Sequence, residues 1–229
     1  MKALIVTLQY KVHVEAIRSH IQAATHWQNA GIRFDWLHVH GMPDSALLPN
    51  SAEGHDIVTA KYIEARETFL AGDYDVFIAI EDDMIIPVDT FPRLVTALER
   101  DADVAYGLYC WRRGSYAWSA YTDINEDKGK SISRHDRERA IQAFTCGEVM
   151  QVAGVGMGCT AIRRDALARI PFERRDHACN DWYFAVDAKM IGLVSVCDFG
   201  LVCGHITTER GKQVIYPAVN DNLYRVEYL

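Results

Sequence analysis

A chain of 229 residues with 49% hydrophobic and 24% charged side chains is long enough for one substantial core, and this composition excludes disordered and fibrous proteins. The net charge of −7 argues against a general affinity for nucleic acid or anionic membranes, because both need a positive field. There is no signal-peptide pattern and no apolar run near the roughly 20 residues of a membrane span. Six cysteines without a CxxC pair predict reduced thiols in a cytoplasmic protein.

The first half of the chain alternates between expected strands and helices. Apolar runs of strand length cover residues 3–8, 32–40, 76–80 and 104–110. Helical spacing covers 14–30, 56–71 and the segment after Asp89, with a proline- and glycine-rich loop at 41–55. Strands that alternate with helices pair mainly in parallel. The sequence therefore predicts a mixed, mainly parallel α/β sheet flanked by helices.

The second half of the chain is less regular. Residues 111–147 are rich in charge and aromatic side chains, which is typical of a surface loop with a short helix at 134–143. Glycines alternate along 152–162, and Gly192 ends a helix expected at 180–191. A short helix at 165–169 and short strands at 193–197 and 201–203 complete the pattern. We expect one compact domain whose two halves meet near residue 110 without a hinge.

Three acids, Glu81, Asp82 and Asp83, directly follow the apolar run 76–80. Ligands of α/β sheets bind at the carboxyl ends of the strands. Adjacent carboxylates repel each other unless a cation or hydrogen-bond donors neutralise them, and Mg²⁺ and Mn²⁺ prefer oxygen ligands. In extended backbone Glu81 and Asp83 face one side while Asp82 faces away. The alternative is a polar strand end whose acids meet water or cap the next helix.

Residues 74–84, YDVFIAIEDDM, resemble the DxD segment of GT-A glycosyltransferases, particularly family 2 and its relatives. The resemblance implies a GT-A (Rossmann-like) fold, with Asp83 ligating Mn²⁺ or Mg²⁺. It also implies that Glu81 holds the ribose or helps to hold the metal. Asp82, which faces away from Glu81 and Asp83, is a further candidate contact of the nucleotide sugar. By the same resemblance, residues 1–110 form the nucleotide-sugar-binding half and residues 111–229 the acceptor-binding, catalytic half.

Further segments resemble the same family. Glu64-Ala65-Arg66 is similar to an Ala-Arg-Asn element whose arginine approaches the nucleotide, although Arg66 can equally pair with neighbouring glutamates. Gly156 belongs to a segment like the glycine-rich element beside donor and acceptor, where glycine lets substrate approach the backbone. The alternative for this segment is a bulged strand.

The C-terminal part carries two more implied site residues. Asn180-Asp181 is similar to the Glu-Asp-x-x-Phe element, in which the aspartate is the general base for the acceptor hydroxyl; Asp181 can alternatively cap its helix. His205 follows the last core strand, where several GT-A families place a metal ligand. Arg210 or Lys212, in an expected flexible loop at 207–213, would contact the phosphates.

The nucleobase of a GT-A donor usually meets the end of the first strand. Here that position holds Thr7, Gln9 and Tyr10. On the acceptor side, aromatic residues of the segment 111–147 are candidates to stack on sugar rings, namely Trp111, Tyr116, Trp118 and Tyr121.

The combined hypothesis is a metal-dependent glycosyltransferase, most simply a hexosyltransferase. It would move a sugar from a nucleoside-diphosphate sugar, UDP rather than GDP, to an unidentified hydroxyl acceptor; nucleic acid is disfavoured as a partner, although a modified base remains open as acceptor. One rival is a sugar-phosphate nucleotidyltransferase, which usually has a glycine-rich loop after the first strand; residues 7–11 lack glycine. A second rival is a non-catalytic module that binds nucleotide sugars.

Overall fold

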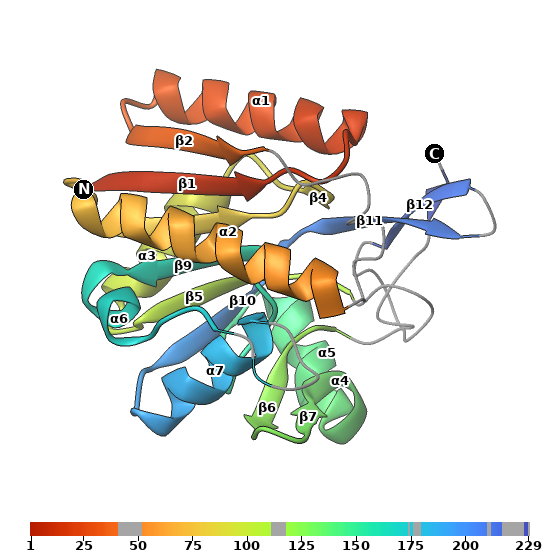
Figure 1. Cartoon of the computed structure of the whole chain (residues 1–229). Coiled ribbons are helices and arrows are strands. Elements are labelled where there is room, and N and C mark those ends of the chain that lie inside the picture. The colour runs from red at the N-terminus through yellow and green to blue at the C-terminus, as the bar shows by residue number, and fades with distance from the viewer. Residues whose placement is uncertain are drawn as a thin grey trace.

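A seven-stranded sheet runs through the centre of the protein (Figure 1). The computed structural model describes residues 1–40, 52–110, 118–173, 175, 180–209, 212–216 and 227–228. In spatial order the strands are β2 (Arg33–Val39), β1 (Lys2–Leu8), β3 (Val76–Ile80), β9 (Cys159–Arg163), β5 (Val104–Leu108), β10 (Ser195–Val202) and β8 (Val149–Gln151). Strands β9 and β8 run antiparallel to their neighbours and the other pairings are parallel. This confirms the predicted mixed, mainly parallel α/β sheet.

Helices cover both faces of the sheet. They are α1 (Val14–Asn29), α2 (Ala52–Ala71), α3 (Thr90–Glu99), α6 (Arg164–Arg169) and α7 (Asn180–Met190). Figure 1 shows α2 in front of the sheet and α3 behind it. On the rear face Trp27 of α1 contacts Phe91 of α3, with ring centroids 5.7 Å apart. On the front face Phe172 lies between Tyr62 of α2 and Phe184 of α7.

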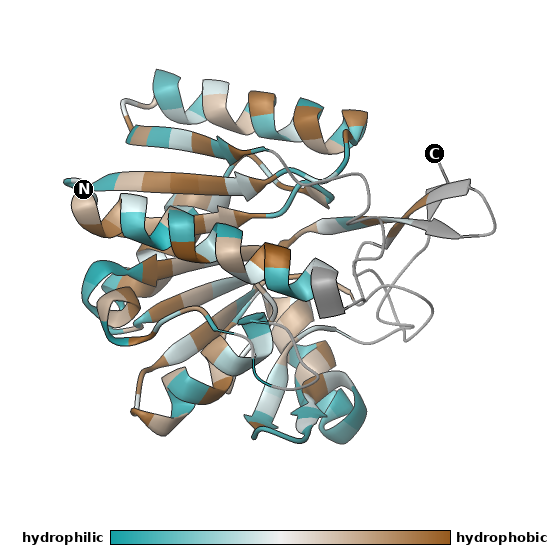
Figure 2. Ribbon diagram, viewed as in Figure 1, coloured by the Kyte–Doolittle hydropathy of each residue, from teal (hydrophilic) through white to brown (hydrophobic). Residues whose placement is uncertain are grey.

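The central strands are apolar on both sides because helices cover both sides. All five residues of β3 and all five of β5 are buried. Figure 2 shows hydrophobic colour along the strands of the sheet and mixed colours along the helices that cover it. The unbroken apolar runs in the sequence are therefore a direct consequence of the doubly covered sheet.

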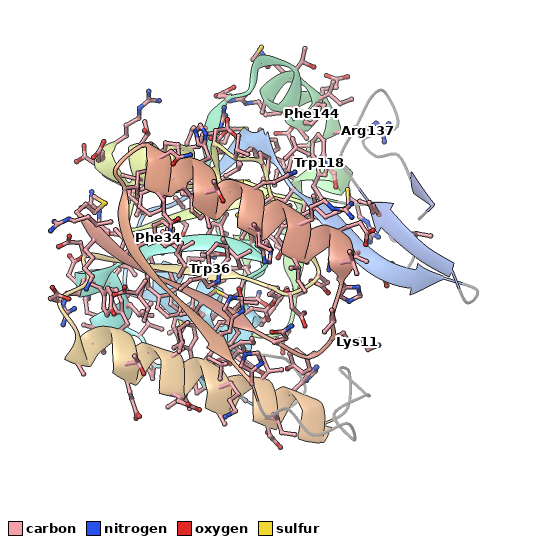
Figure 3. All side chains as sticks on the ribbon, turned by 90° about the horizontal axis from the view of Figure 1, so that it is seen from above. Lys11, Phe34, Trp36, Trp118, Arg137 and Phe144 are labelled. Atoms are coloured by element: carbon pink, nitrogen blue, oxygen red, sulfur yellow. The ribbon has the colours of Figure 1, made fainter. Side chains whose placement is uncertain are left out.

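The segment expected as a surface loop is substantially folded. Within residues 118–147 the chain forms β6 (Tyr121–Ile124), β7 (Gly129–Ser131), α4 (Ile132–His135) and α5 (Arg137–Cys146). Trp118 is fully buried against Phe144 and Phe199, and Figure 3 shows it close to Phe144. A sugar contact for Trp118 is therefore excluded, while Trp111 and Tyr116 lie outside the described residues. The short helix expected at 134–143 is present as α5, whereas strands as short as β6 and β7 have too few apolar positions to show a period.

A small second sheet adjoins the carboxyl edge of the large one. Its strands are β4 (Met84–Ile85), β11 (Gly204–Glu209), β12 (Lys212–Tyr216) and β13 (Glu227–Tyr228). The expected flexible loop at 207–213 is largely the β11–β12 hairpin, in which Glu209 pairs with Lys212. Arg210, the side chain of Lys212 and residues 41–51 of the expected early loop lie outside the described part.

Two sequence expectations concern the chain as a whole. Within the described residues, no helix has the length and apolarity that a bilayer crossing requires. The five cysteines of that part are free thiols, and all except Cys146 are buried.

The two strands expected at 193–197 and 201–203 are one continuous strand, β10.

Candidate active site at the carboxyl edge of the sheet

The acidic run continues β3 beyond the carboxyl edge of the sheet. The backbone N–H of Glu81 donates to the carbonyl oxygen of Gly158 at 3.0 Å, which holds the run against the glycine-rich segment. Asp83 lies in the turn before β4 and is only 5% exposed. A carboxylate buried this deeply needs compensating partners or a cation.

His205 meets Asp83 because β11 pairs with β4. His205 lies opposite Met84 in this pairing, and the N–H of Ile206 donates to the carbonyl oxygen of Asp83 at 2.8 Å. As a result His205 Nε2 lies 3.6 Å from Asp83 Oδ2. The structure thus brings together two residues that are far apart in the sequence and that both carry good ligands for a divalent cation.

The orientation of the His205 ring is fixed by its other nitrogen. Nδ1 lies 2.8 Å from the carbonyl oxygen of Cys110. A carbonyl oxygen can only accept, so Nδ1 carries the proton and donates it. Nε2 then faces Asp83, where its lone pair can bind a cation. This is the arrangement of a metal-binding histidine whose second nitrogen is held by the backbone.

Asp82 turns toward the loop between β1 and α1. Its Oδ2 accepts hydrogen bonds from the backbone N–H groups of Tyr10 and Lys11, at 2.6 and 2.7 Å. Lys11 is exposed on this loop, as Figure 3 shows. These bonds make Asp82 a brace of the loop, and they turn it away from Asp83 as expected. A contact of Asp82 with the nucleotide sugar stays a prediction.

The three residues proposed for the nucleobase differ in accessibility. Thr7 is buried, and its hydroxyl accepts a hydrogen bond from Trp36 Nε1 at 3.0 Å. Gln9 and Tyr10 are half-buried, and the N–H of Gln9 donates to Val39 at 3.1 Å. The loop is therefore held by β2 on one side and by Asp82 on the other.

Asp181 approaches the glycine-rich segment from the first turn of α7. A Cβ atom placed on Gly156 would lie 2.4 Å from Tyr109 Oη and 3.1 Å from Asp181 Oδ2. A Cβ on Gly158 would lie 2.9 Å from Tyr109 Cζ and 3.1 Å from Met84 Sδ. The glycines therefore permit a contact that any side chain would obstruct, and they bring Asp181 to the same edge as the acidic run.

Tyr109, at the end of β5, joins these parts and was not identified from the sequence. Its ring lies edge-on to His205, with centroids 5.4 Å apart, and its hydroxyl accepts the N–H of Gly158 at 3.2 Å. Burial, followed by the charges of Glu81 and Asp181, raises the pKa of Tyr109 well above its usual value. The phenol therefore remains neutral. The available signal was its position just after a buried strand.

Arg66 lies elsewhere. Its Nε and a terminal nitrogen donate to the carbonyl oxygens of Leu167 and Ala168, both at 3.0 Å. Helix α6 follows β9 beside the start of β3, at the edge of the sheet opposite Asp83. The structure thus has Arg66 holding the end of α6 instead of making the predicted nucleotide contact.

Two protein side chains, Asp83 and His205, are placed to hold a cation at this site. Within the described residues, no three His, Cys, Asp or Glu side chains group closely enough to hold a metal ion. Asp83 and His205 fit a divalent cation by their atom types, and other ligands would have to come from substrate oxygens or water. Glu81, the third predicted ligand, joins this edge through its backbone bond to Gly158.

Solved structures similar to this chain include one with a TM-score above 0.5 and others below it. A197 from STIV covers 100% of this chain and 94% of its own length, with a TM-score of 0.61 and 17% identity. S. aureus TarS 1–349 in complex with UDP-GlcNAc covers 86% of this chain and 56% of its own, with a TM-score of 0.46 and 11% identity. A glycosyltransferase involved in glycosylation of the major capsid of PBCV-1 has a TM-score of 0.36 and 10% identity over 73% of this chain and 62% of its own. No protein-family model and no curated protein matches the sequence.

The likeness to A197 concerns the fold alone at this level of identity. Together with the sheet order and the helices on both faces, it supports the GT-A, Rossmann-like class that the sequence predicted. The function has to be argued from the site.

Proposed function

We propose that this chain is a metal-dependent glycosyltransferase that moves a sugar, most simply a hexose, from a UDP-sugar to an acceptor hydroxyl. The observation that carries the proposal is the pairing of Asp83 and His205 at 3.6 Å, with His205 Nδ1 held by a carbonyl oxygen. Paired oxygen and imidazole ligands suit Mn²⁺, and Mg²⁺ less well. When bound, the ion would neutralise the charge of the diphosphate leaving group.

In this proposal the remaining residues divide between donor and acceptor. Gln9, Tyr10 and Glu81 contact the nucleoside, and Asp181 orients the acceptor hydroxyl and accepts its proton. As that oxygen bonds to the anomeric carbon, the bond from this carbon to the diphosphate breaks. The neutral phenol of Tyr109 lies beside Asp181 without adding a second negative charge. Arg210 and Lys212 remain proposed phosphate contacts.

The rival nucleotidyltransferase is disfavoured by Asp82. Such an enzyme would cradle phosphates with backbone N–H groups of the loop after the first strand. Here the N–H groups of Tyr10 and Lys11 already donate to the Asp82 carboxylate. An anion at this position would have to displace a carboxylate that belongs to the protein. A UDP-sugar donor also has a precedent in the fold class, since TarS was solved with UDP-GlcNAc.

The decisive experiment is a thermal-shift and product assay with a panel of UDP- and GDP-sugars, with and without Mn²⁺. A ligand at 100-fold excess over its Kd stabilises the folded state by about 2.7 kcal/mol, which corresponds to roughly 5 °C for a domain of this size. We expect this shift only with a UDP-sugar and Mn²⁺ together, accompanied by slow release of UDP. Release of pyrophosphate would support the rival enzyme, and binding without turnover a binding module.

Asp83→Asn tests the metal ligand in the same assay. The substitution keeps the size of the side chain but removes its charge, so we expect the Mn²⁺-dependent shift and UDP release to disappear. Asp101→Asn is the matched control, because Asp101 is an exposed acid at the opposite edge of the sheet. A normal Mn²⁺ response in Asp83→Asn would refute the assignment of Asp83.

A further inference from the structure

The β6–β7 hairpin, residues 121–131, is bonded to the glycine-rich segment. The N–H of Tyr121 donates to the carbonyl oxygen of Gly154 at 3.0 Å, and the N–H of Ala153 donates to that of Tyr121 at 2.7 Å. Gly154 lies two residues before Gly156. The hairpin therefore shares a backbone network with the segment against which Asp181 lies.

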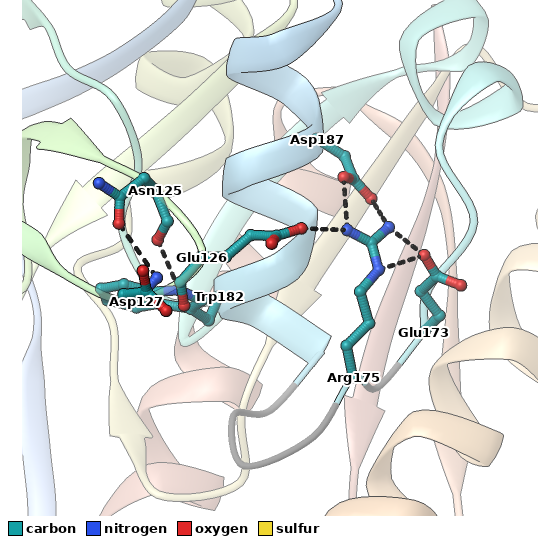
Figure 4. Close-up of polar contacts among 7 residues, drawn as sticks. All are labelled: Asn125, Glu126, Asp127, Glu173, Arg175, Trp182 and Asp187. Atoms are coloured by element: carbon teal, nitrogen blue, oxygen red, sulfur yellow. Dashed lines mark hydrogen bonds and ion pairs between the residues drawn. The ribbon is translucent and has the colours of Figure 1, made fainter.

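The same hairpin is attached to α7 by Trp182. The indole Nε1 donates to the carbonyl oxygens of Asn125 and Glu126 at 3.1 and 3.2 Å, and Figure 4 shows the indole beside the hairpin tip. Its ring lies edge-on to Tyr121, with centroids 5.5 Å apart. A Cβ on Gly129 would lie 2.5 Å from Tyr121 Cδ1 and 3.0 Å from Trp182 Cη2, so the pair fits only over a glycine.

Arg175 is a second brace on the hairpin tip. Its guanidinium makes two hydrogen bonds to the carboxylate of Asp187 on α7, at 3.0 and 2.6 Å, and contacts Glu173 (Figure 4). It also pairs with Glu126 at 3.7 Å. These acids raise the pKa of Arg175, which stays charged. The segment that leads into α7 is thus tied both to the helix and to the hairpin.

These contacts form a closed ring that includes the Asp181 carboxylate. Asp181 Oδ2 faces Gly156, and Oδ1 accepts the backbone N–H of Trp182 at 2.7 Å. From Gly156 the chain of contacts runs through Gly154, the hairpin and the Trp182 indole back to Asp181. Trp182 thus joins the hairpin directly to the turn that carries Asp181.

We propose that Trp182 is a positioning residue: by fixing the β6–β7 hairpin to the first turn of α7, it holds the Asp181 carboxylate against Gly156, where the acceptor hydroxyl is deprotonated. This inference rests on the proposed function, because it assigns Asp181 a proton to accept. A displacement of about 1 Å in such a group lowers turnover strongly while leaving the donor site intact.

Trp182→Phe tests the proposal, because it keeps an aromatic ring beside Tyr121 but removes the N–H that both carbonyl groups accept. The assay is Mn²⁺-dependent UDP release from the UDP-sugar that stabilises the wild type most, with water as acceptor. We expect kcat to fall about tenfold while KM for the UDP-sugar stays within about twofold. Gly129→Ala, which forces the two rings apart, should act in the same direction.

Lys189→Met is the matched control. Lys189 joins the far end of α7 to the hairpin, through Asp123 at 2.6 Å and the carbonyl oxygen of Ile124 at 2.9 Å. Its loss loosens the same hairpin away from Asp181, so kcat should remain unchanged even if the melting temperature falls. An equal fall in kcat for Lys189→Met would show that general loosening is responsible and would overturn the proposal.

A double variant shows whether Trp182 acts through Asp181. In an Asp181→Asn background, adding Trp182→Phe should cause no further loss of kcat, because the carboxylate that it positions is already gone. A further tenfold loss, or wild-type kcat in Trp182→Phe alone, would refute the positioning role. Absence of Mn²⁺-dependent UDP release from the wild type would instead refute the proposed function itself, and this inference with it.

Discussion

Replacing His20 should change how stability depends on pH. His20 lies on α1, is 6% exposed, and donates from Nε2 to the carbonyl oxygen of Met84 at 2.9 Å, next to Asp83 in the chain. Burial lowers its pKa from 6.5 to about 4, although the hydrogen bond to Met84 opposes the shift. The folded protein therefore keeps His20 neutral in a range where the unfolded chain would protonate it.

The loss of stability in acid can be calculated from the lowered pKa of His20. Above pH 6.5 His20 is neutral in both the folded and the unfolded state and costs no stability. As the pH falls from 6.5 toward 4, only the unfolded state binds the proton, so the folded state becomes progressively less stable. A difference of about 2.5 pKa units corresponds to about 3 kcal/mol, at roughly 1.4 kcal/mol per unit. Between pH 6.5 and 4 the free energy of unfolding of the wild type should therefore fall by about 3 kcal/mol more than that of a variant without the histidine.

His20→Gln is the suitable variant, because its amide nitrogen takes the place of Nε2 and keeps the bond to Met84. Urea unfolding followed by tryptophan fluorescence, between pH 7.5 and 4, gives the free energy of unfolding for both proteins. The packing lost with the ring adds a constant offset, and groups common to both proteins cancel in the difference. His26→Gln, at an exposed position of the same helix, is the control and should follow the wild type. Parallel curves for wild type and His20→Gln would refute the reasoning.

Two further predictions concern the site and its scaffold. Gly156→Ala adds a Cβ only 2.4 Å from Tyr109 Oη and should lower kcat for UDP release about 100-fold by separating Tyr109 from Asp181; steady-state kinetics with wild-type kcat would show that the two do not meet there. Arg66→Gln should lower the free energy of unfolding by about 1 to 2 kcal/mol in urea, because the end of α6 loses charged donors. Its KM for the donor should not change, and a raised KM would restore the nucleotide role.

Arg66 illustrates where a motif is a poor guide to a side chain. The apolar spacing of residues 56–71 correctly predicted the helix on which Arg66 lies, since α2 spans Ala52–Ala71. The direction of the guanidinium depends on the carbonyl groups within reach, and those belong to α6, which the sequence places a hundred residues later. A local motif contains no information about that neighbour.

The segment 111–147 illustrates a different difficulty. The helix expected at 134–143 is present as α5, but the strands β6 and β7 are too short to show a hydrophobic period, so charge and aromatic content suggested a loop there. Trp118 is nevertheless buried, because its partners Phe144 and Phe199 come from α5 and β10. Only the assembled core shows which aromatic side chains it encloses.

The sequence alone determined the properties that depend on local spacing. The fully buried strand β3 and the acids after it followed from five apolar residues and then three carboxylates, and the α/β class followed from the alternation of periods. The tertiary structure decided which of these residues meet. Strand β9 inserts antiparallel between β3 and β5, and this brings Gly156 and Gly158 to the acidic run. The β4–β11 pairing brings His205 to Asp83. Such contacts depend on strand order across the sheet, which no local period encodes.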